Sequence, residues 1–558
     1  MRAAIHRSAR LLGSVALFGL CACGGGGGGG GDDGDDASAG SSGGSEGGSE
    51  SGDTTPGSCT PAPGRVGLQR LTRAEYNRTV RDLFGVTSAP ADMFPPDSAT
   101  SGFDNNAASL TVSPQLASLL LDAAEAVAAE AMVNQAATII ACDPVAADCA
   151  RETLAALAQR VYRRPPTDAE LDDLLALFAA SQSEGDTFAA SIEHALTGML
   201  MAPQFLYRSV PPSASDAAAG TIVALDDWAL ATRLSYFVWG STPDDALLTR
   251  AGEGTLRDDT VLRVELDRML ADPKAGALYD GFVSQWLQLG KLAAATPDAG
   301  AFPQFDEEMR AAMLEEMRLF FAGIRARDGS ALEIVNGTQT FANAGLAEIY
   351  GVQGPTGDEL VAITTDPTQR AGVLTMPAVL TMTSGPTSPN IVKRGVWLAE
   401  TILCAAPPPP PEGVPPAPDP QPGETEREQL ERHREDPSCG SCHNLIDPLG
   451  FGFEHYDALG AWRDQADGEP VDDLGTLPDG REYRGMVELA GLLATGDEYP
   501  ICVTSKVMTY ALGRVMDDAD ACAVEDIATT NVTLDATLSD LLWAVVTSDA
   551  FLSEEIAP

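Results

Sequence analysis

The sequence predicts a mainly α-helical, multi-domain protein. Apolar residues recur at helical spacing over most of the chain between Arg65 and Gly351, and helix-capping signals precede several of these runs. Strand patterns are confined to short runs near Thr221–Leu225 and Val361–Thr364. The 558 residues are 44% hydrophobic, which is enough for about three or four domains with sizeable cores.

The N-terminus has the pattern of a signal peptide, which we place at residues 1–23. Positive charges at Arg2, His6, Arg7 and Arg10 precede an apolar run from Leu11 to Leu20 that is too short to span a bilayer. The run ends in Leu20-Cys21-Ala22-Cys23, as in a bacterial lipoprotein signal. Small Ala22 precedes Cys23, whereas bulky Leu20 precedes Cys21, so we predict lipidation at Cys23. The alternative is an ordinary secretory signal, and both interpretations export the chain.

Residues 24–64 are predicted to form a flexible tether. A glycine run and an Asp/Ser/Gly stretch supply almost no apolar surface to offset the entropy lost on ordering. The tether would connect a lipid anchor to the folded body.

The chain is strongly acidic. Its 35 Lys and Arg against 81 Asp and Glu give a formal net charge of −46. This charge argues against nucleic acid and anionic membrane surfaces as partners, so we expect membrane contact through the lipid anchor only. It suits a soluble surface or docking to a basic redox partner.

The helical body divides into modules by its capping and breaker signals. Thr72-Arg-Ala-Glu75 is a capping box that opens a helix closed by Gly85, and Ser113-Pro114 starts a second. Thr167-Asp-Ala-Glu170 caps another. Further helices are predicted at Ile192–Leu206, Asp226–Val238 and Glu307–Ile324. The expected modules are 65–135, 136–208, 209–351 and 352–405, then a spacer at 406–422 with ten prolines in 17 residues, a segment at 423–470 and a helical module at 471–558.

The most specific motif is Cys439-Gly-Ser-Cys442-His443 in the 423–470 segment. Two cysteines one helical turn apart can each form a thioether to a haem vinyl group, and the histidine that follows becomes the proximal iron ligand. The motif therefore predicts one c-type haem, held by Cys439, Cys442 and His443 in a C-terminal cytochrome c-like helical domain.

Two other interpretations of the motif stay open. The cysteines can form a redox or structural disulfide, although a thioredoxin-like pair should follow a strand, and here a proline-rich and polar stretch precedes it. They can also supply half of a zinc site, but the sequence has no second CxxC or HxxxH.

The order of several longer motifs resembles one bacterial family. The motifs are Leu71–Gly85 (LTRAEYNRTVRDLFG), Tyr162–Pro165, Ala202–Arg208, Arg233–Trp239 with Thr242–Asp245, Thr387–Pro389 with Lys393–Gly395, His433-Arg434, Asp447–Glu454 with Tyr456-Asp457, and Tyr510–Arg514. The chain resembles a secreted family of unknown function, common in planctomycetes and myxobacteria. That family combines the domain of unknown function 1592 with modules 1587, 1595, 1588 and 1585.

The resemblance implies a secreted, haem-carrying protein, because such modules often accompany a cytochrome c domain. This chain has no additional N-terminal cytochrome domain, so we expect one haem. His433 lies in the His-Arg motif and is one candidate for the distal iron ligand. Met486 and Met508 are candidates for a Met/His pair, and an open site is the third possibility.

The remaining cysteines suit disulfides in an exported protein. Cys142 and Cys149 flank a short loop and are expected to pair. Cys502 and Cys522 bracket one helix, and Cys59 with Cys404 forms a further candidate pair, although pairing cannot be deduced from sequence.

Two charged groups near the motif are weaker candidates. Asp447, Glu454, Asp457 and Asp464 form an acidic cluster that suits calcium or a partner, or that pairs with arginines and caps helices. Lys393-Arg394 suits haem propionates or surface salt bridges.

These observations favour an exported, lipid-anchored c-type haem protein that transfers electrons at the outer membrane, in the periplasm or on the cell surface. Two alternatives are a structural or binding lipoprotein with a CxxC disulfide, and a haem-dependent oxidative enzyme acting on an extracellular substrate.

Overall fold

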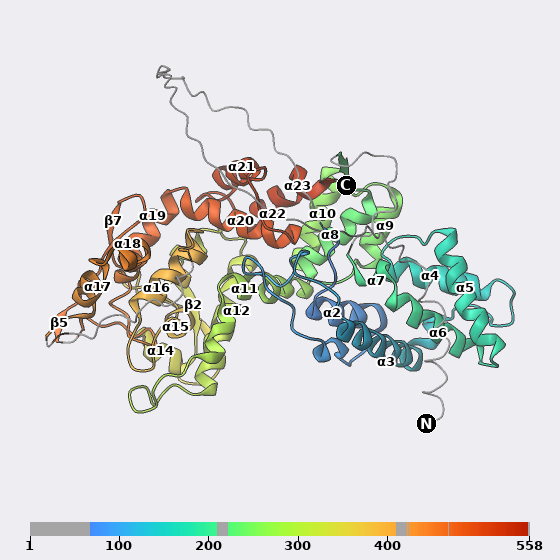
Figure 1. Ribbon diagram of the computed structural model, residues 1–558, viewed down its shortest axis with the longest axis horizontal. Helices are drawn as coiled ribbons and strands as arrows, with labels where there is room; N and C mark the ends of the chain where they lie inside the picture. The colour runs from blue at the N-terminus through green and yellow to red at the C-terminus, as the bar shows by residue number, and fades with distance from the viewer. Residues whose placement is uncertain (1–66, 209–220, 409–420, 422, 467, 556–558) are drawn as a thin grey trace, which may run out of the picture. The chain divides into compact units, whose positions relative to one another are not determined.

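The computed structural model describes residues 67–208, 221–408, 421, 423–466 and 468–555 (Figure 1). The predicted signal, Cys23, Cys59, the tether and most of the proline-rich spacer lie outside these ranges. Within them helices dominate, and the strands form four two-stranded antiparallel sheets. The prediction of a mainly α-helical protein is confirmed. None of the described helices is long and apolar enough to cross a membrane.

The N-terminal helices begin where their capping signals predict. Thr72 and Thr167 complete capping boxes, and Ser113 caps a helix that has Pro114 in its first turn. Gly85 ends the first helix at a φ of 61°, a left-handed conformation that favours glycine. The elements are α2 (Arg73–Phe84), η1 (Pro90–Met93), α3 (Pro114–Ile139), α4 (Cys149–Val161), α5 (Asp168–Ser183), α6 (Phe188–Met201) and α7 (Pro203–Leu206).

The predicted helix at Ile192–Leu206 is two helices. α6 ends at Met201 and α7 begins at Pro203, with Ala202 between them in an extended conformation (φ −72°, ψ 145°). The proline ring disfavours the helical region for the residue before it, so the break is local in origin.

The middle of the chain continues as helices, with two short strands. Its elements are β1 (Ile222–Ala224), α8 (Asp227–Trp239), α9 (Asp245–Glu253), α10 (Asp259–Ala271), η2 (Pro273–Gly276), the π-helical η3 (Tyr279–Val283), α11 (Ser284–Trp286), η4 (Leu289–Ala294), α12 (Glu307–Ala326), α13 (Glu333–Asn336), β2 (Gln339–Ala342) and α14 (Ala344–Tyr350).

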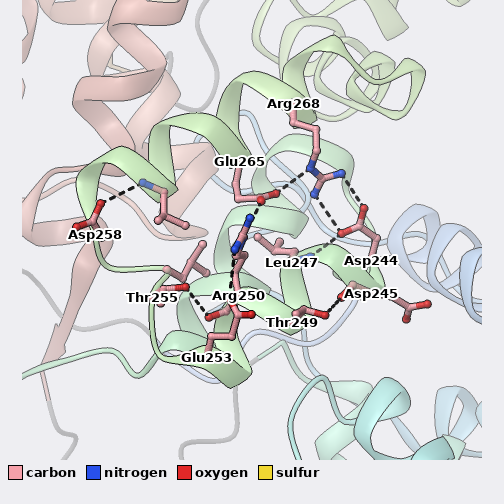
Figure 2. A network of polar contacts seen from close by, with 12 residues as sticks. Asp244, Asp245, Leu247, Thr249, Arg250, Glu253, Thr255, Asp258, Glu265 and Arg268 are labelled. Carbon is pink, nitrogen blue, oxygen red and sulfur yellow. Dashed lines mark hydrogen bonds and ion pairs between the residues drawn. The ribbon is translucent and has the colours of Figure 1, made fainter.

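An ion-pair network ties α9 to α10 (Figure 2). Asp244 caps α9 and accepts two hydrogen bonds from Arg268 of α10, at 2.8 and 3.1 Å. Glu265 lies 2.8 Å from Arg268 and 3.5 Å from Arg250 of α9. The Arg268 guanidinium also lies 5.5 Å from the ring centroid of Trp239, so the network supports the C-terminal end of α8.

The C-terminal part contains the CxxCH segment and the last helices. Its elements are β3 (Val361–Thr364), η5 (Gly372–Thr375), α15 (Pro377–Met382), α16 (Ile391–Trp397), the π-helical η6 (Leu398–Ile402), α17 (Glu426–Arg434), α18 (Pro437–Phe451), β4 (Gln465–Ala466), β5 (Glu469–Pro470), β6 (Leu474–Thr476), β7 (Glu482–Arg484), α19 (Gly485–Thr495), α20 (Glu498–Leu512), α21 (Ala521–Asn531), α22 (Leu538–Val546), α23 (Asp549–Leu552) and β8 (Ser553–Glu555).

The strands pair both locally and across the chain. β1 pairs with β8, with Val223 opposite Glu554, and β2 pairs with β3, with Phe341 opposite Ala362. β4 pairs with β5, and β6 with β7. Both strand runs predicted from the sequence, at 221–225 and 361–364, are therefore present as β1 and β3.

The helices share two large hydrophobic cores and one small one. The first contains residues between Leu71 and Leu206 together with Tyr236 of α8. The second contains Phe103 together with residues between Leu230 and Phe551. The small core consists of Ile391, Leu430 and Phe451, one from each of α16, α17 and α18. Leu430 is thus the single apolar residue that α17 contributes to these cores.

Buried arginines fasten loops and helix ends by binding several backbone carbonyls each. Arg163 donates to the carbonyls of 204, 205 and 207, Arg233 to those of 550, 551 and 553, Arg370 to those of 349, 375 and 460, and Arg394 to those of 453, 456 and 457. A guanidinium has five donors and no acceptor, so one side chain can satisfy several buried carbonyls at once.

The disulfides correct part of the expected pairing. Cys142 is bonded to Cys149 as predicted. Cys502 is bonded to Cys404 and not to Cys522, so neither the expected 502–522 pair nor the candidate 59–404 pair forms. Cys522 is also disulfide-bonded. Cys502 lies within α20 and Cys522 within the next helix, α21, and α20 brings Cys502 beside Cys404 just after η6.

Candidate functional site

The CxxCH motif occupies the third to seventh residues of α18. Asp436 caps this helix by accepting a hydrogen bond from the Ser438 N–H at 2.8 Å, and Pro437 occupies the first helical position. The start at Pro437 places Cys439 and Cys442 one turn apart. Both thiols are free; Cys439 is buried and Cys442 is half-buried.

Gly440, between the two cysteines, lets α17 pack closely against α18. A Cβ atom at this position would lie 2.7 Å from the carbonyl oxygen of Arg434, the last residue of α17. This close approach brings His433 beside His443, with ring centroids 4.7 Å apart and ring planes at 88°. Of the candidate distal ligands, His433 is therefore the one in contact with His443.

Asp447 holds the His443 ring. The His443 Nδ1 lies 2.9 Å from the Asp447 Oδ1, one turn further along α18, and the Asp447 side chain is fully buried. With Nδ1 engaged, Nε2 is the ring nitrogen left for a ligand. His443 itself is 22% exposed.

Asp447 is a buried carboxyl that is only partly compensated by nearby positive charge. Burial raises the pKa of its carboxyl, while the hydrogen bond from His443 and the nearby Arg434 oppose that rise. Its Oδ2 has no hydrogen-bond partner, and the nearest cation is the Arg434 Nε at 3.9 Å. Burial also lowers the pKa of His433, and the neighbouring His443 lowers it further.

Two glycines bring α16 against α18 behind the motif. A Cβ atom at Gly395 would overlap the carbonyl oxygen of Ile446, and one at Gly450 would overlap that of Ile391. Arg427 of α17 lies over the Phe451 ring at 3.7 Å. The motif is thus mounted on a tightly packed helix, and its His433 side is carried by α17, which contributes one apolar residue, Leu430, to the cores.

The two candidate methionines lie elsewhere. The Met486 methyl group is next to Gly452, nine residues beyond His443 and about 13 Å along the helix axis. Met508 is fully buried in α20, in the large second core. The structure brings neither next to His443, and the identity of the distal ligand stays a prediction.

Arg394 does not have either of the roles expected from its sequence. It is 1% exposed and donates to the carbonyls of Phe453, Tyr456 and Asp457, so it is neither a propionate ligand nor part of a surface salt bridge. Burial lowers the pKa of its guanidinium to about 9. Lys393 is exposed and donates to the Ser384 carbonyl at 3.3 Å.

The acidic residues after the motif do not converge on one point. Asp457 accepts from the N–H groups of Leu459 and Ala461, and Asp464 accepts from the Trp462 indole. Glu454 is mostly buried, which raises its pKa to about 7. The described residues contain no group of three or more His, Cys, Asp or Glu side chains arranged to hold a metal ion, so the calcium interpretation of this cluster is not supported.

The role of Asp447 was missed at the sequence level. It was grouped with the acidic cluster, yet its spacing of four residues from His443 on one predicted helix is the signal that would have paired them.

Comparisons with known families cover most of the chain after residue 68. Five family models match in order, each described as a protein of unknown function: DUF1587 over 69–133, DUF1595 over 149–209, DUF1592 over 225–352, DUF1588 over 370–466 and DUF1585 over 479–551. The chain belongs to this five-module family of unknown function. The DUF1588 model, which includes the CxxCH motif, carries the short name PSCyt3. No curated protein and no solved structure matches the chain.

Proposed function

We propose that the 423–470 segment carries one covalently attached c-type haem and that the protein transfers electrons outside the cytoplasm. The observation that carries this proposal is the arrangement on α18. Two free thiols lie one turn apart, next to a histidine whose Nδ1 is fixed by a buried carboxylate.

The donor set suits haem c. Cys439 and Cys442 would form the thioethers, and the His443 Nε2 would face the iron. Asp447 would fix the tautomer and orientation of the ring, as carboxylates do for metal-binding histidines. The haem would supply one-electron chemistry at physiological potentials.

The position of His433 bears on the sixth ligand. Its ring touches that of His443, so a porphyrin between them requires α17 to move away from α18. The small core under α17 allows such a movement at a low cost in apolar contact. His433 is therefore our leading candidate for the distal ligand.

Export is supported by the disulfides and by the predicted signal peptide. Cys142–Cys149 and Cys404–Cys502 are bonded, as is typical of proteins that fold in oxidising compartments. Haem c is attached in the same compartments, so the two parts of the proposal are consistent.

Covalent attachment is tested by expressing the full chain in a host with cytochrome c maturation and staining a denaturing gel for haem. We expect wild type to stain, Cys439→Ser or Cys442→Ser to lose most of the stain, and the double variant to lose all of it. The matched control is Cys142→Ser/Cys149→Ser, which also removes two cysteines and should stain normally.

A colourless wild type from a competent host would contradict the haem proposal and favour a structural or binding lipoprotein. For a haem-loaded protein, a high-spin spectrum that His433→Ala does not change would contradict ligation by His433. It would indicate open iron and favour the oxidative enzyme over the carrier.

A further inference from the structure

A second candidate site lies in a cavity of about 400 Å³ formed by α2, η2, η3 and α12. None of its lining residues belongs to the 423–470 segment. The volume is in the range of pockets that hold small organic molecules.

The deep part of the cavity is apolar. Trp239, Val507, Ile334 and Leu542 line it and are each no more than 6% exposed. The ring of Trp239 is fixed because its indole N–H donates to the Met269 carbonyl at 3.0 Å. The network of Figure 2 supports the same ring through Arg268, so this wall is rigid.

The rim is positively charged in a strongly negative chain. Five basic residues line the cavity against two acidic ones; they are Arg78, Arg81, Lys274, Arg318 and Arg325, with Asp82 and Asp280. Arg318 is paired with Glu315, so the local excess is two positive charges, in contrast with a net charge of −46 for the whole sequence. In so acidic a chain, this is the combination expected where an anion binds.

The Asp82 carboxylate contacts three different side chains at this rim. The Asp82 Oδ2 lies 3.0 Å from the Lys274 Nζ and 2.8 Å from the Ser241 hydroxyl, and its Oδ1 lies 3.8 Å from the Arg81 Nε. Arg81 and Lys274 are 61% and 38% exposed, so both can turn toward a ligand at the mouth. Their two charges exceed what Asp82 alone neutralises.

The backbone beside the cavity is also unusual. η3 is a π-helical turn, and π-helical turns are rare and occur frequently at functional sites. It passes directly over the Tyr510 side chain, because a Cβ atom at Gly281 would overlap the tyrosine hydroxyl. Two of its residues, Phe282 and Val283, add to the apolar wall.

We propose that this cavity binds a small amphipathic carboxylate of the medium-chain fatty-acid class. The apolar chain would lie along Trp239 and Val507, and the carboxylate would lie between Arg81 and Lys274. This inference does not depend on the haem proposal, because the two sites share no residue.

The test uses the purified full chain and isothermal titration with decanoate below its micelle-forming concentration. We expect one decanoate per chain and no binding of decyltrimethylammonium, which has the same tail and the opposite charge. Arg81→Gln/Lys274→Gln should weaken decanoate binding at least fivefold. Ala322→Leu, at a half-buried position in the lining, should weaken it by occupying the cavity.

The matched control is Arg151→Gln/Arg160→Gln, two exposed arginines that pair with Asp172 and Asp245 outside the cavity. It should bind decanoate as wild type does, and both double variants should unfold at the wild-type temperature. Equal binding of the cationic and anionic amphiphiles, an equal loss in the control pair, or no decanoate binding by wild type would each overturn the proposal.

Discussion

Glu316 of α12 is a carboxyl buried completely in the second core. It accepts hydrogen bonds from the Thr340 hydroxyl at 2.7 Å and the Tyr350 hydroxyl at 2.5 Å, while its Oε2 has no hydrogen-bond partner. Burial raises its pKa to about 7, and the two hydrogen bonds only partly oppose that rise. The folded protein therefore retains the Glu316 proton at a pH where the unfolded chain releases it.

This pKa predicts a loss of stability as the pH rises from about 4.5 to about 7. Between those values the unfolded state binds fewer protons at this site than the folded state, so the contribution falls by about 3 kcal/mol. Glu316→Gln keeps an acceptor for both hydroxyls and cannot ionise. The unfolding free energies of wild type and this variant are measured by urea titration at pH 5 and pH 8. Because the group in the unfolded chain is already mostly ionised at pH 5, wild type should lose about 2–3 kcal/mol relative to the variant between these two pH values.

The neighbouring Glu315→Gln is the control. Glu315 is partly exposed, and its hydrogen bond with Arg318 lowers its pKa, so its effect on stability should be the same at pH 5 and pH 8. An equal pH dependence in both variants would contradict the assignment to Glu316.

Asp447 should tune the proposed haem through His443. Asp447→Asn removes the negative charge behind the imidazole and weakens its basicity, which disfavours the oxidised iron. We expect the reduction potential to rise, by roughly 60 mV for each tenfold change in relative affinity for the two oxidation states. Asp464→Asn, whose carboxylate contacts Trp462 instead, should leave the potential unchanged. A potential that is identical in wild type and Asp447→Asn would show that the contact does not act on the iron.

At the scale of elements, α16 and α18 can cross closely because glycines, which have no side chain, lie at the contact. Gly395→Ala would place a methyl group on the Ile446 carbonyl. Alanine favours a helix over glycine by up to about 1 kcal/mol, but overpacking of this contact should cost more, so we expect a net loss of about 2 kcal/mol in unfolding free energy. Gly491→Ala in α19 has open space around the new atom and should be neutral or stabilising. Thermal unfolding of the two variants distinguishes them, and equal melting temperatures would contradict this account of the helix crossing.

Several motifs that define the family are explained at the same scale. Arg163, Arg233 and Arg394 each belong to one of the longer sequence motifs, and each binds three backbone carbonyls. For Arg394 the sequence suggested a haem propionate or a surface salt bridge, whereas all three side chains fasten loops. Only contacts between distant segments distinguish these two roles.

For the whole molecule, the Cys404–Cys502 disulfide closes a loop of sequence separation 98 that contains the entire CxxCH segment. Removing it should cost about 4–5 kcal/mol through the entropy of the unfolded chain, against about 2 kcal/mol for Cys142–Cys149 with its separation of 7. Urea unfolding of Cys404→Ser/Cys502→Ser and Cys142→Ser/Cys149→Ser compares the two. A larger loss from the short loop would contradict this ranking.

Anchoring is a property of the full chain that the sequence predicts at Cys23. Small Ala22 before Cys23 suits a lipoprotein signal peptidase, and bulky Leu20 before Cys21 does not. Partitioning into the detergent phase should therefore disappear in Cys23→Ser and persist in Cys21→Ser. The opposite pattern would move the anchor by two residues, and a wild type that stays in the aqueous phase would contradict lipidation.

The sequence by itself determined the features that depend on near neighbours. Capping boxes at Thr72 and Thr167, the proline start at Ser113-Pro114 and the short Cys142–Cys149 loop are local, so spacing alone identified them. The helical class and the family also followed from such patterns. Pro203 also indicates the helix break at Ala202 from local sequence. The apolar periodicity continues across the break, however, and therefore predicted a single helix.

The tertiary structure alone decided everything that joins distant segments. It pairs Cys404 with Cys502, places Met486 at the far end of α18 from His443, and turns His433 toward His443. The cavity lined by Arg81, Lys274 and Val507 likewise draws on three regions of the chain. Such proximities depend on which helix faces pack together, and that choice minimises exposed apolar area over the whole core rather than within any one stretch of sequence.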